Sequence, residues 1–331
     1  MAYTRKSRMP NRRRTNRRRN TRTGGKHLTK TEKKETKAIV NATLNRKLES
    51  KYFNCKSITD SIALYRCRTN TNGIGVRGFA TCEDKNAQGT RIQYGRDTSD
   101  NSVKYLTELN MNRSFSDQDS AGTERSNSIV GHYCNPSLAQ SEFILERDYL
   151  QSSAGGSDYS TLNVAPYFVR VLRLCPRPTK LSTVDIDPEN DAFVNELGQQ
   201  TGVADSAFGP AQLMLYKVNS RKYKVVGDIK FEMVPPFTTT EVDTGIGTDA
   251  LVTNIAKSGF MKKLVMRHDI GKKLYFESGS GSSGNSTAGQ KNEFILFHTC
   301  QLGINSTNSL SSNSALNLLM SGKFVSTFKD P

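Results

Sequence analysis

Residues 215–226 read LYKVNSRKYKVV and form the clearest hairpin signal in the chain. Tyr216 and Val218 alternate with polar neighbours and lead into an Asn–Ser dipeptide. After this link, Tyr223 and Val225 resume the alternation. A period of two is the pattern of half-buried strands, and a short polar link between two such runs is typical of a hairpin. The stretch therefore predicts two antiparallel strands paired with each other.

Strand signals continue on both sides of this hairpin, from Tyr52 onward. Turns rich in Gly, Asn, Ser and Pro separate the candidate strands, which are Ser57–Arg68, Ile74–Cys82, Arg91–Gly95, Ser128–Cys134, Glu142–Leu150, Val164–Leu174, Ala211–Val218, Arg221–Val234, Met261–Arg267, Lys273–Ser278, Glu293–Leu302 and Lys323–Phe328. Prolines at 235–236 end one of them, because proline donates no ladder hydrogen bond. Many short strands with few helices indicate a mainly β sandwich or barrel with long loops.

One helix is expected within this β pattern, at Pro188–Gln199. Asp187 precedes it as a cap, Pro188 suits the first helical position, and Gly198 lies near the end. The run Ser278–Gly289 is expected to be a flexible loop, because strand signals continue on both sides of it.

A short amphipathic helix is expected between the N-terminal segment and the body, at residues 31–51. Thr29 and Glu32 have the spacing of a capping box. Val40, Leu44 and Leu48 recur every four residues and so share one helical face. A frayed, charged linker is the alternative that the composition leaves open.

The net charge of +16 is confined to one end of the chain. Residues 1–51 carry +15, and residues 52–331 carry only +1. Residues 1–30 hold 12 Lys and Arg, no acidic residue and almost no apolar side chains, so they cannot bury enough surface to offset the entropy of ordering. We expect a disordered basic arm at 1–30 and a shell domain at 52–331.

The arm is the candidate nucleic-acid site. Its guanidinium forks pair bidentately with phosphate, and a flexible basic cluster binds nucleic acid by counterion release with little sequence preference. The predicted contact residues are Arg5, Lys6, Arg8, Arg12, Arg13, Arg14, Arg17, Arg18, Arg19, Arg22 and Lys26. A nuclear-import signal is a compatible second use of the same residues. An anionic membrane patch is less favoured, because no apolar anchor accompanies the charge.

Two motifs in the body resemble ligand sites. Gly73–Gly78 matches GxGxxG, but a dinucleotide site needs this motif to open a helix, and the residues that follow read as strand and then turn. We expect these glycines to serve a tight turn. Asp185–Asp191 alternates carboxylates but has Asn190 where a calcium loop has glycine, so these acids are expected to favour the first turn of a helix. A divalent cation at a subunit contact stays open.

No catalytic, metal or cofactor site is predicted. The four histidines (His27, His132, His268 and His298) show neither HExxH nor zinc-ligand spacing to a cysteine. His298 alternates within a predicted strand. The six cysteines are scattered without a CxxC, which in a chain with no signal peptide indicates reduced thiols. No run of 18 apolar residues is present, so no membrane insertion is expected.

Three stretches resemble the capsid proteins of circular, Rep-encoding single-stranded DNA viruses, the circovirus-like group. They are YFVRVLRL at 167–174, SRKYKVVGDIKF at 220–231, and the segment from Lys262-Lys263-Leu264 through Lys273-Leu274-Tyr275-Phe276. The resemblance implies a single jelly-roll sandwich that self-assembles into an icosahedral shell of about 60 copies and packages single-stranded DNA through the arm. It further implies a virion protein that visits the host nucleus, with an import receptor and a cell-surface receptor as partners.

Two other functions stay open at this stage. A capsid of a small RNA virus or satellite would share the sandwich and the arm, because the arm's electrostatics do not distinguish RNA from DNA. A cellular nucleic-acid-binding protein or enzyme with a basic tail would need a recognition module or a catalytic cluster in the body, and the sequence proposes neither.

Overall fold

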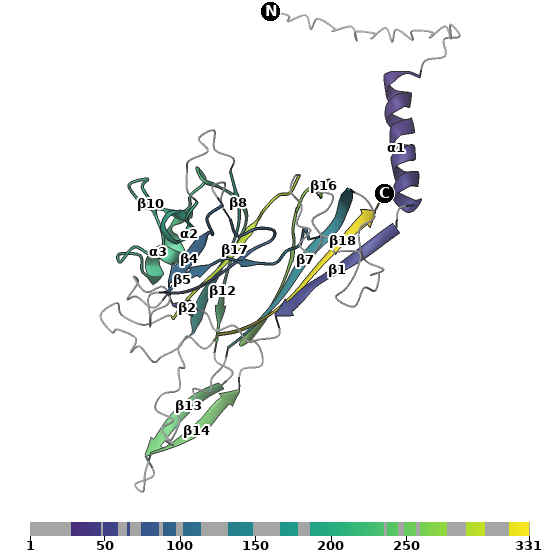
Figure 1. Cartoon of the computed structure of the whole chain (residues 1–331). Helices are drawn as coiled ribbons and strands as arrows, with labels where there is room; N and C mark the ends of the chain where they lie inside the picture. The colour runs from purple at the N-terminus through teal and green to yellow at the C-terminus, as the bar shows by residue number, and fades with distance from the viewer. Residues whose placement is uncertain are drawn as a thin grey trace, which may run out of the picture. The chain divides into compact units, whose positions relative to one another are not determined.

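The computed structural model describes residues 28–47, 49–58, 65–66, 74–85, 89–96, 102–113, 132–147, 166–177, 186–234, 237–243, 248–255, 259–276, 289–301 and 318–330. The chain divides into two compact units, Met1–Lys47 and Leu48–Pro331. The first unit contains helix α1 (Lys30–Lys47). The second is the body, which is mostly β as the sequence predicts (Figure 1).

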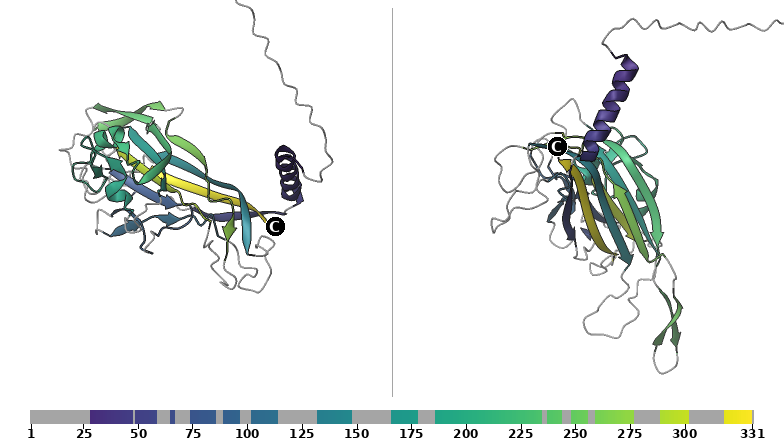
Figure 2. Two further views of the ribbon diagram at one scale, coloured as in Figure 1. Left: turned by 90° about the horizontal axis from the view of Figure 1, so that it is seen from above. Right: turned by 90° about the vertical axis from the view of Figure 1, so that its right-hand side faces the viewer.

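Two four-stranded antiparallel paths build the body. The first sheet has the order β1-β18-β7-β15 and the second has the order β12-β8-β17-β3. Their bounds are Glu49–Ile58 (β1), Ile74–Ala80 (β3), Tyr133–Arg147 (β7), Tyr167–Pro176 (β8), Tyr223–Met233 (β12), Met261–Arg267 (β15), Phe294–Gln301 (β17) and Leu318–Asp330 (β18). Figure 2 shows β7 and β18 running side by side along the first sheet.

The pairing of these strands is that of a jelly roll. Taken as first to eighth along the chain, the first strand pairs with the eighth (β1 with β18), the second with the seventh (β3 with β17), the third with the sixth (β7 with β15), and the fourth with the fifth (β8 with β12). This is one long hairpin that has rolled up, and the β18–β7 and β17–β8 ladders close the roll. The predicted single jelly-roll sandwich is therefore present.

The core between the two sheets is aromatic. Phe143 of β7 contacts Phe297 of β17 at 4.9 Å between ring centroids, and Phe79 of β3 and Phe324 of β18 at 5.4 Å each. All four rings are at most 1% exposed. They come from both sheets, so this cluster holds the sheets face to face.

A second apolar core lies on the other face of the β12-β8-β17-β3 sheet. We call the elements that cover it the cover layer: α2 (Pro188–Asp191), β9 (Phe193–Val194), β10 (Gln200–Thr201), α3 (Pro210–Leu215), β11 (Lys217–Val218), β4 (Gln93–Arg96) and β5 (Val103–Tyr105). Phe193, Phe208 and Leu213 of the cover layer pack with Leu172 and Leu296 of the sheet. Strand β8 is therefore buried on both faces, which explains its nearly continuous apolar sequence.

Five further strands complete the description. β2 (Tyr65–Arg66) and β6 (Thr107–Glu108) pair with β3, and β16 (Leu274–Tyr275) pairs with β7. β13 (Phe237–Asp243) and β14 (Thr248–Ile255) pair with each other in a separate two-stranded ladder.

The predicted helix at Pro188–Gln199 is mostly wrong. α2 ends at Asp191, and Phe193 then enters β9, where its ring is fully buried in the second core. The Asn195 side chain accepts hydrogen bonds from the backbone N–H groups of Leu197 and Gln199, at 3.0 and 2.9 Å, and so builds a turn in place of the helix. Burial of Phe193 outweighs the helical signal that Asp187 and Pro188 begin.

The predicted strand at Ala211–Val218 and the hairpin at 215–226 are also wrong. Residues Pro210–Leu215 form α3, which starts with proline at its first position and buries Leu213. β11 pairs with β9, whereas β12 pairs with β8, so the two expected hairpin strands lie in different sheets. Asn219 decides this separation, because its buried side chain donates to the Asp191 carbonyl at 3.0 Å.

Strand β7 runs through a predicted break. The sequence indicates two strands, Ser128–Cys134 and Glu142–Leu150, with Pro136 between them. The structure has one strand of 15 residues, and Pro136 lies opposite Phe328 next to a bulge in the β18 ladder. A bulge tolerates proline because the ladder is already interrupted there.

The described part of the GxGxxG motif, residues 74–78, lies in a strand and not at the tight turn expected of it. Gly75 and Gly78 belong to β3, whose residues are almost all buried. A Cβ added at Gly78 would lie 2.9 Å from the ring of Tyr94 in β4, closer than side chains tolerate. Glycine is needed here because the cover layer packs directly on the β3 backbone.

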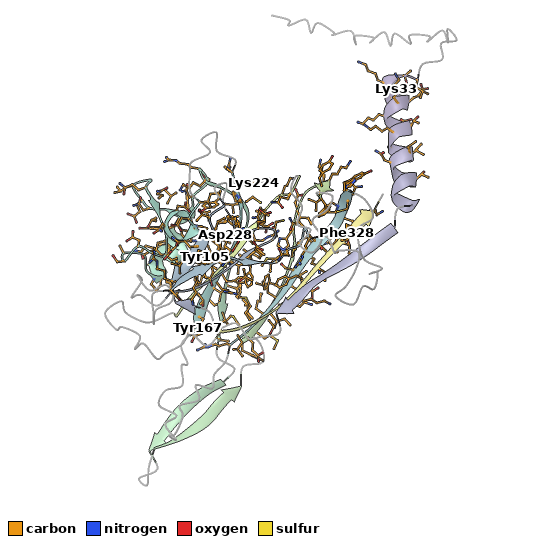
Figure 3. All side chains as sticks on the ribbon, viewed as in Figure 1. Lys33, Tyr105, Tyr167, Lys224, Asp228 and Phe328 are labelled. Atoms are coloured by element: carbon orange, nitrogen blue, oxygen red, sulfur yellow. The ribbon has the colours of Figure 1, made fainter. Side chains whose placement is uncertain are left out.

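Arg170 joins the cover layer to the sheet. Its guanidinium, 2% exposed, makes two parallel hydrogen bonds to the Asp228 carboxylate of β12, at 2.9 and 2.7 Å. The same group donates to the carbonyls of Leu213 at 2.6 Å and Tyr216 at 2.9 Å, at the end of α3. One buried charge thus binds three elements, and Figure 3 labels Asp228 within the body.

Replacing Arg170 with methionine is expected to lower the free energy of unfolding by about 3 kcal/mol, because Asp228 and two helix-end carbonyls lose their donor. Denaturant unfolding of the unassembled chain measures this. The control is Lys263→Met, which breaks an exposed 3.1 Å ion pair with Glu142 and is expected to cost less than about 1 kcal/mol. Equal losses in the two variants would contradict the role assigned to Arg170.

Candidate nucleic-acid interface

All eleven residues predicted to contact nucleic acid, Arg5 to Lys26, lie outside the described residues. Their assignment therefore stays a prediction from composition. The description begins at Leu28, and α1 starts four residues after Lys26. Residues 1–47, which contain both arm and helix, carry 17 Lys and Arg against two acids, so nearly all of the excess charge belongs to this unit.

Helix α1 begins at the capping box that the sequence contains. The Glu32 carboxylate accepts from the Thr29 backbone N–H at 2.8 Å and from the Thr29 hydroxyl at 2.9 Å. The Thr29 hydroxyl in turn accepts from the Glu32 backbone N–H at 3.2 Å. These bonds lower the pKa of Glu32 and set the residue at which the helix starts.

The acidic run at 185–191 is used for structure within the cover layer. Asp187 caps α2 by accepting from the Glu189 N–H at 3.2 Å. Asp191 accepts from the Lys222 ammonium at 2.7 Å and the Tyr223 hydroxyl at 2.6 Å. Burial raises the pKa of Asp191 in spite of these donors. Asp185 lies outside the described residues.

A second buried ionic cluster bridges the two sheets. Glu293, at the start of β17, accepts from Arg173 of β8 at 2.5 Å and lies 3.2 Å from the His268 ring beyond β15. His268 also hydrogen-bonds the Ser141 hydroxyl of β7 at 2.7 Å. Burial opposes the ionised form of Glu293, but the hydrogen bonds from His268 and Arg173 outweigh it and lower the pKa of this carboxylate. These polar contacts therefore connect the two sheets.

His298 lies in β17 as predicted, fully buried beside Arg170. Burial, together with the charge of Arg170, lowers the pKa of His298 to about 3. Burial also raises the pKa of Cys82 and of Cys300 to about 12, which keeps both as thiols. Buried cysteines that stay protonated are poor nucleophiles, and the His298 ring packs against Phe193 at 5.5 Å between ring centroids.

Within the described part of the chain, no three His, Cys, Asp or Glu side chains gather in a way that would hold a metal ion. The helices described there include none with the length and hydropathy to cross a membrane.

Comparison with known proteins finds similarity among solved structures and not among sequences. No protein-family model matches the chain, and no curated protein sequence is similar to it. A solved structure of Desmodium yellow mottle tymovirus matches over 86% of this chain and 87% of its own, with 6% sequence identity and a TM-score of 0.28. At that level of similarity, the fold assignment rests on the strand order described above and not on this superposition.

Acid should destabilise the fold through His298. Its pKa is about 3 in the folded chain and 6.5 when unperturbed, so unfolding takes up a proton between these pH values. Above pH 6.5 this group does not reduce the free energy of unfolding. As the pH is lowered from 6.5 to 3, the free energy of unfolding decreases by about 1.4 kcal/mol per pH unit.

The test is the free energy of unfolding from pH 7 to pH 3.5 for the wild-type chain and for His298→Gln, which keeps an N–H donor but does not titrate. We expect the dependence on pH to be shallower in the variant by about one proton. Parallel curves would show that His298 is not the group responsible.

Proposed function

We propose that the chain is a viral capsid protein that self-assembles into an icosahedral shell and packages nucleic acid with its N-terminal unit. The observation that carries the proposal is the separation of charge from fold. A jelly-roll body with a net charge of +1 follows a segment that carries +15. Jelly rolls occur in capsids, lectins and cupins, and the basic segment favours the first of these.

The body suits a shell wall. Its buried charged clusters, around Arg170, Asp191 and Glu293, are all engaged within the fold. In the proposed shell, the nearly neutral body packs against other copies of the body, and the basic arm neutralises the phosphates of the nucleic acid. With about 60 copies, the 12 bases of residues 1–30 would bring about 720 positive charges to the packaged nucleic acid, which is the scale of a small genome.

We propose single-stranded DNA as the packaged molecule, and the virion and the host nucleus as the protein's locations. The support is the sequence resemblance to circovirus-like capsid proteins. Two of the resembling stretches fall mainly in the paired strands β8 and β12, and the third runs from β15 to β16. A small RNA virus remains the alternative, and the nucleic acid itself distinguishes them. Single-stranded DNA would resist alkali and yield to a single-strand nuclease, whereas RNA would be hydrolysed by alkali.

Sedimentation of the purified protein, with absorbance recorded at 260 and 280 nm, tests assembly. We expect a species near 2.2 MDa, the mass of about 60 chains of 36.7 kDa, with a nucleic-acid spectrum. The chain has no Trp and 12 Tyr, so bound nucleic acid would dominate the absorbance ratio. A monomer or dimer under assembly conditions would instead favour a cellular protein with a basic tail.

Truncation of residues 1–27 tests the arm. We expect the truncated chain to fold and to assemble into shells that hold much less nucleic acid, because 11 of the 17 Lys and Arg of residues 1–47 are lost. The 260/280 ratio of the purified particles measures this against the full-length chain. Shells that package as much as wild type would contradict the role proposed for the arm.

A further inference from the structure

Helix α1 separates its charges onto two faces. Lys30, Lys33, Lys34 and Lys37 follow the spacing i, i+3, i+4, i+7, which places all four on one side of a helix with 3.6 residues per turn. Every described side chain of α1, from Lys30 to Thr43, is exposed. Glu32 and Glu35 lie on the opposite side by the same arithmetic. Figure 3 labels Lys33 on this helix.

The spacing brings together only charges of the same sign. Among the charged residues from 30 to 43, the pairs three or four apart are 30–33, 30–34, 33–37 and 34–37 between lysines, and 32–35 between glutamates. Like-charged pairs at these spacings destabilise a helix, and no oppositely charged pair compensates for them. A polar helix that is stable by itself has pairs of oppositely charged side chains three or four residues apart. Because α1 has none among residues 30–43, its charge pattern favours a negatively charged ligand that binds the lysines.

The glutamates do not neutralise the lysine face. Glu32 is held at the helix start by its bonds to Thr29, and Glu35 lies on the far side. An amphipathic membrane helix would need an apolar face opposite its lysines, and α1 has Glu32 and Glu35 there. A polyanion made of repeated phosphates is the ligand chemistry that fits.

We infer that the lysine face of α1, formed by Lys30, Lys33, Lys34 and Lys37, is a second binding surface for the backbone of the packaged nucleic acid. This rests on the proposed packaging function and adds to it a helical site beyond the arm. The four ammonium groups extend over about 10 Å of helix axis and contact phosphate as point charges. Binding removes the repulsion among the lysines, so the helix becomes more stable when nucleic acid is bound.

The salt dependence of binding measures the contribution of this face. The probe is a fluorescent 30-nucleotide poly-dT, titrated by anisotropy at several salt concentrations with the full-length chain and with the chain lacking residues 1–27. The variant is Lys30→Gln, Lys33→Gln, Lys34→Gln and Lys37→Gln together. About 0.7 counterions are released per phosphate contact. We therefore expect the slope of log K against log salt, which is negative, to decrease in magnitude by about 2.8, both in the full-length chain and in the truncated one.

A control of identical composition separates the face from total charge. Lys33→Thr, Lys34→Ala, Ala42→Lys and Thr43→Lys together move two lysines off the face and keep the net charge. We expect the slope to fall by about 1.4, since two contacts are lost. A slope equal to wild type in this variant would show that only net charge matters and would overturn the inference.

Hydrogen exchange over residues 30–43 tests the predicted stabilisation. We expect exchange there to slow on addition of poly-dT in the wild-type chain and to change less in the quadruple Gln variant. Unchanged exchange in wild type would contradict the coupling between binding and helix stability, and tighter binding to anionic vesicles than to poly-dT would overturn the choice of ligand.

The outcomes for the two proposals are separable. If shells form and package nucleic acid, but the quadruple variant keeps the wild-type salt slope, the proposed function is supported and the inference about α1 is wrong. A chain that does not assemble but loses slope in the variant would remove the capsid proposal and leave a nucleic-acid-binding face on α1.

Discussion

The buried guanidinium of Arg170 is the interaction on which the arrangement of the body depends. It donates hydrogen bonds to the last carbonyls of helix α3, pairs with Asp228 in the edge strand β12, and lies over the ring of Phe193 in the second apolar core. Desolvating an arginine is costly, and only the full set of four hydrogen bonds compensates for it. The cover layer, β8 and β12 must therefore be placed together, and this turns a two-sheet sandwich into a molecule of three layers.

This third layer makes the two sheets unlike each other. In the second sheet, β8, β17 and β3 are buried on both faces, and only the edge strand β12 is largely exposed, whereas β7, β15 and β18 alternate buried side chains with exposed or half-buried ones. The buried clusters around Arg173 and Asp191 join charges of opposite sign, and the net positive charge of the sequence lies in residues 1–47. Shape and charge are thus supplied by separate parts of the chain, which is the division that a packaging shell requires.

The class of fold could be predicted because the strand signal is local, but the pairing could not. Tyr223 alternates like a hairpin residue, yet its hydroxyl binds Asp191, 32 positions earlier in the chain. Phe193 stops a well-capped helix because it fills a core made by distant strands. The basic arm stays a prediction from its charge count, because its residues lie outside the described ones. The lysine face of α1 follows from the same sequence once the segment is known to be helical, because Lys30, Lys33, Lys34 and Lys37 have the spacing i, i+3, i+4, i+7.

The pairing of β1 with β18 has a consequence for how the molecule is made. Glu49 lies opposite Asp330, so β1 cannot pair with β18 until residues up to 330 have left the ribosome. β18 lies between β1 and β7, and until it arrives both strands keep open edges. Contacts of such long sequence separation form late in folding. Chains that stop before β18 therefore lack the strand that completes this sheet and keep the edges of β1 and β7 open.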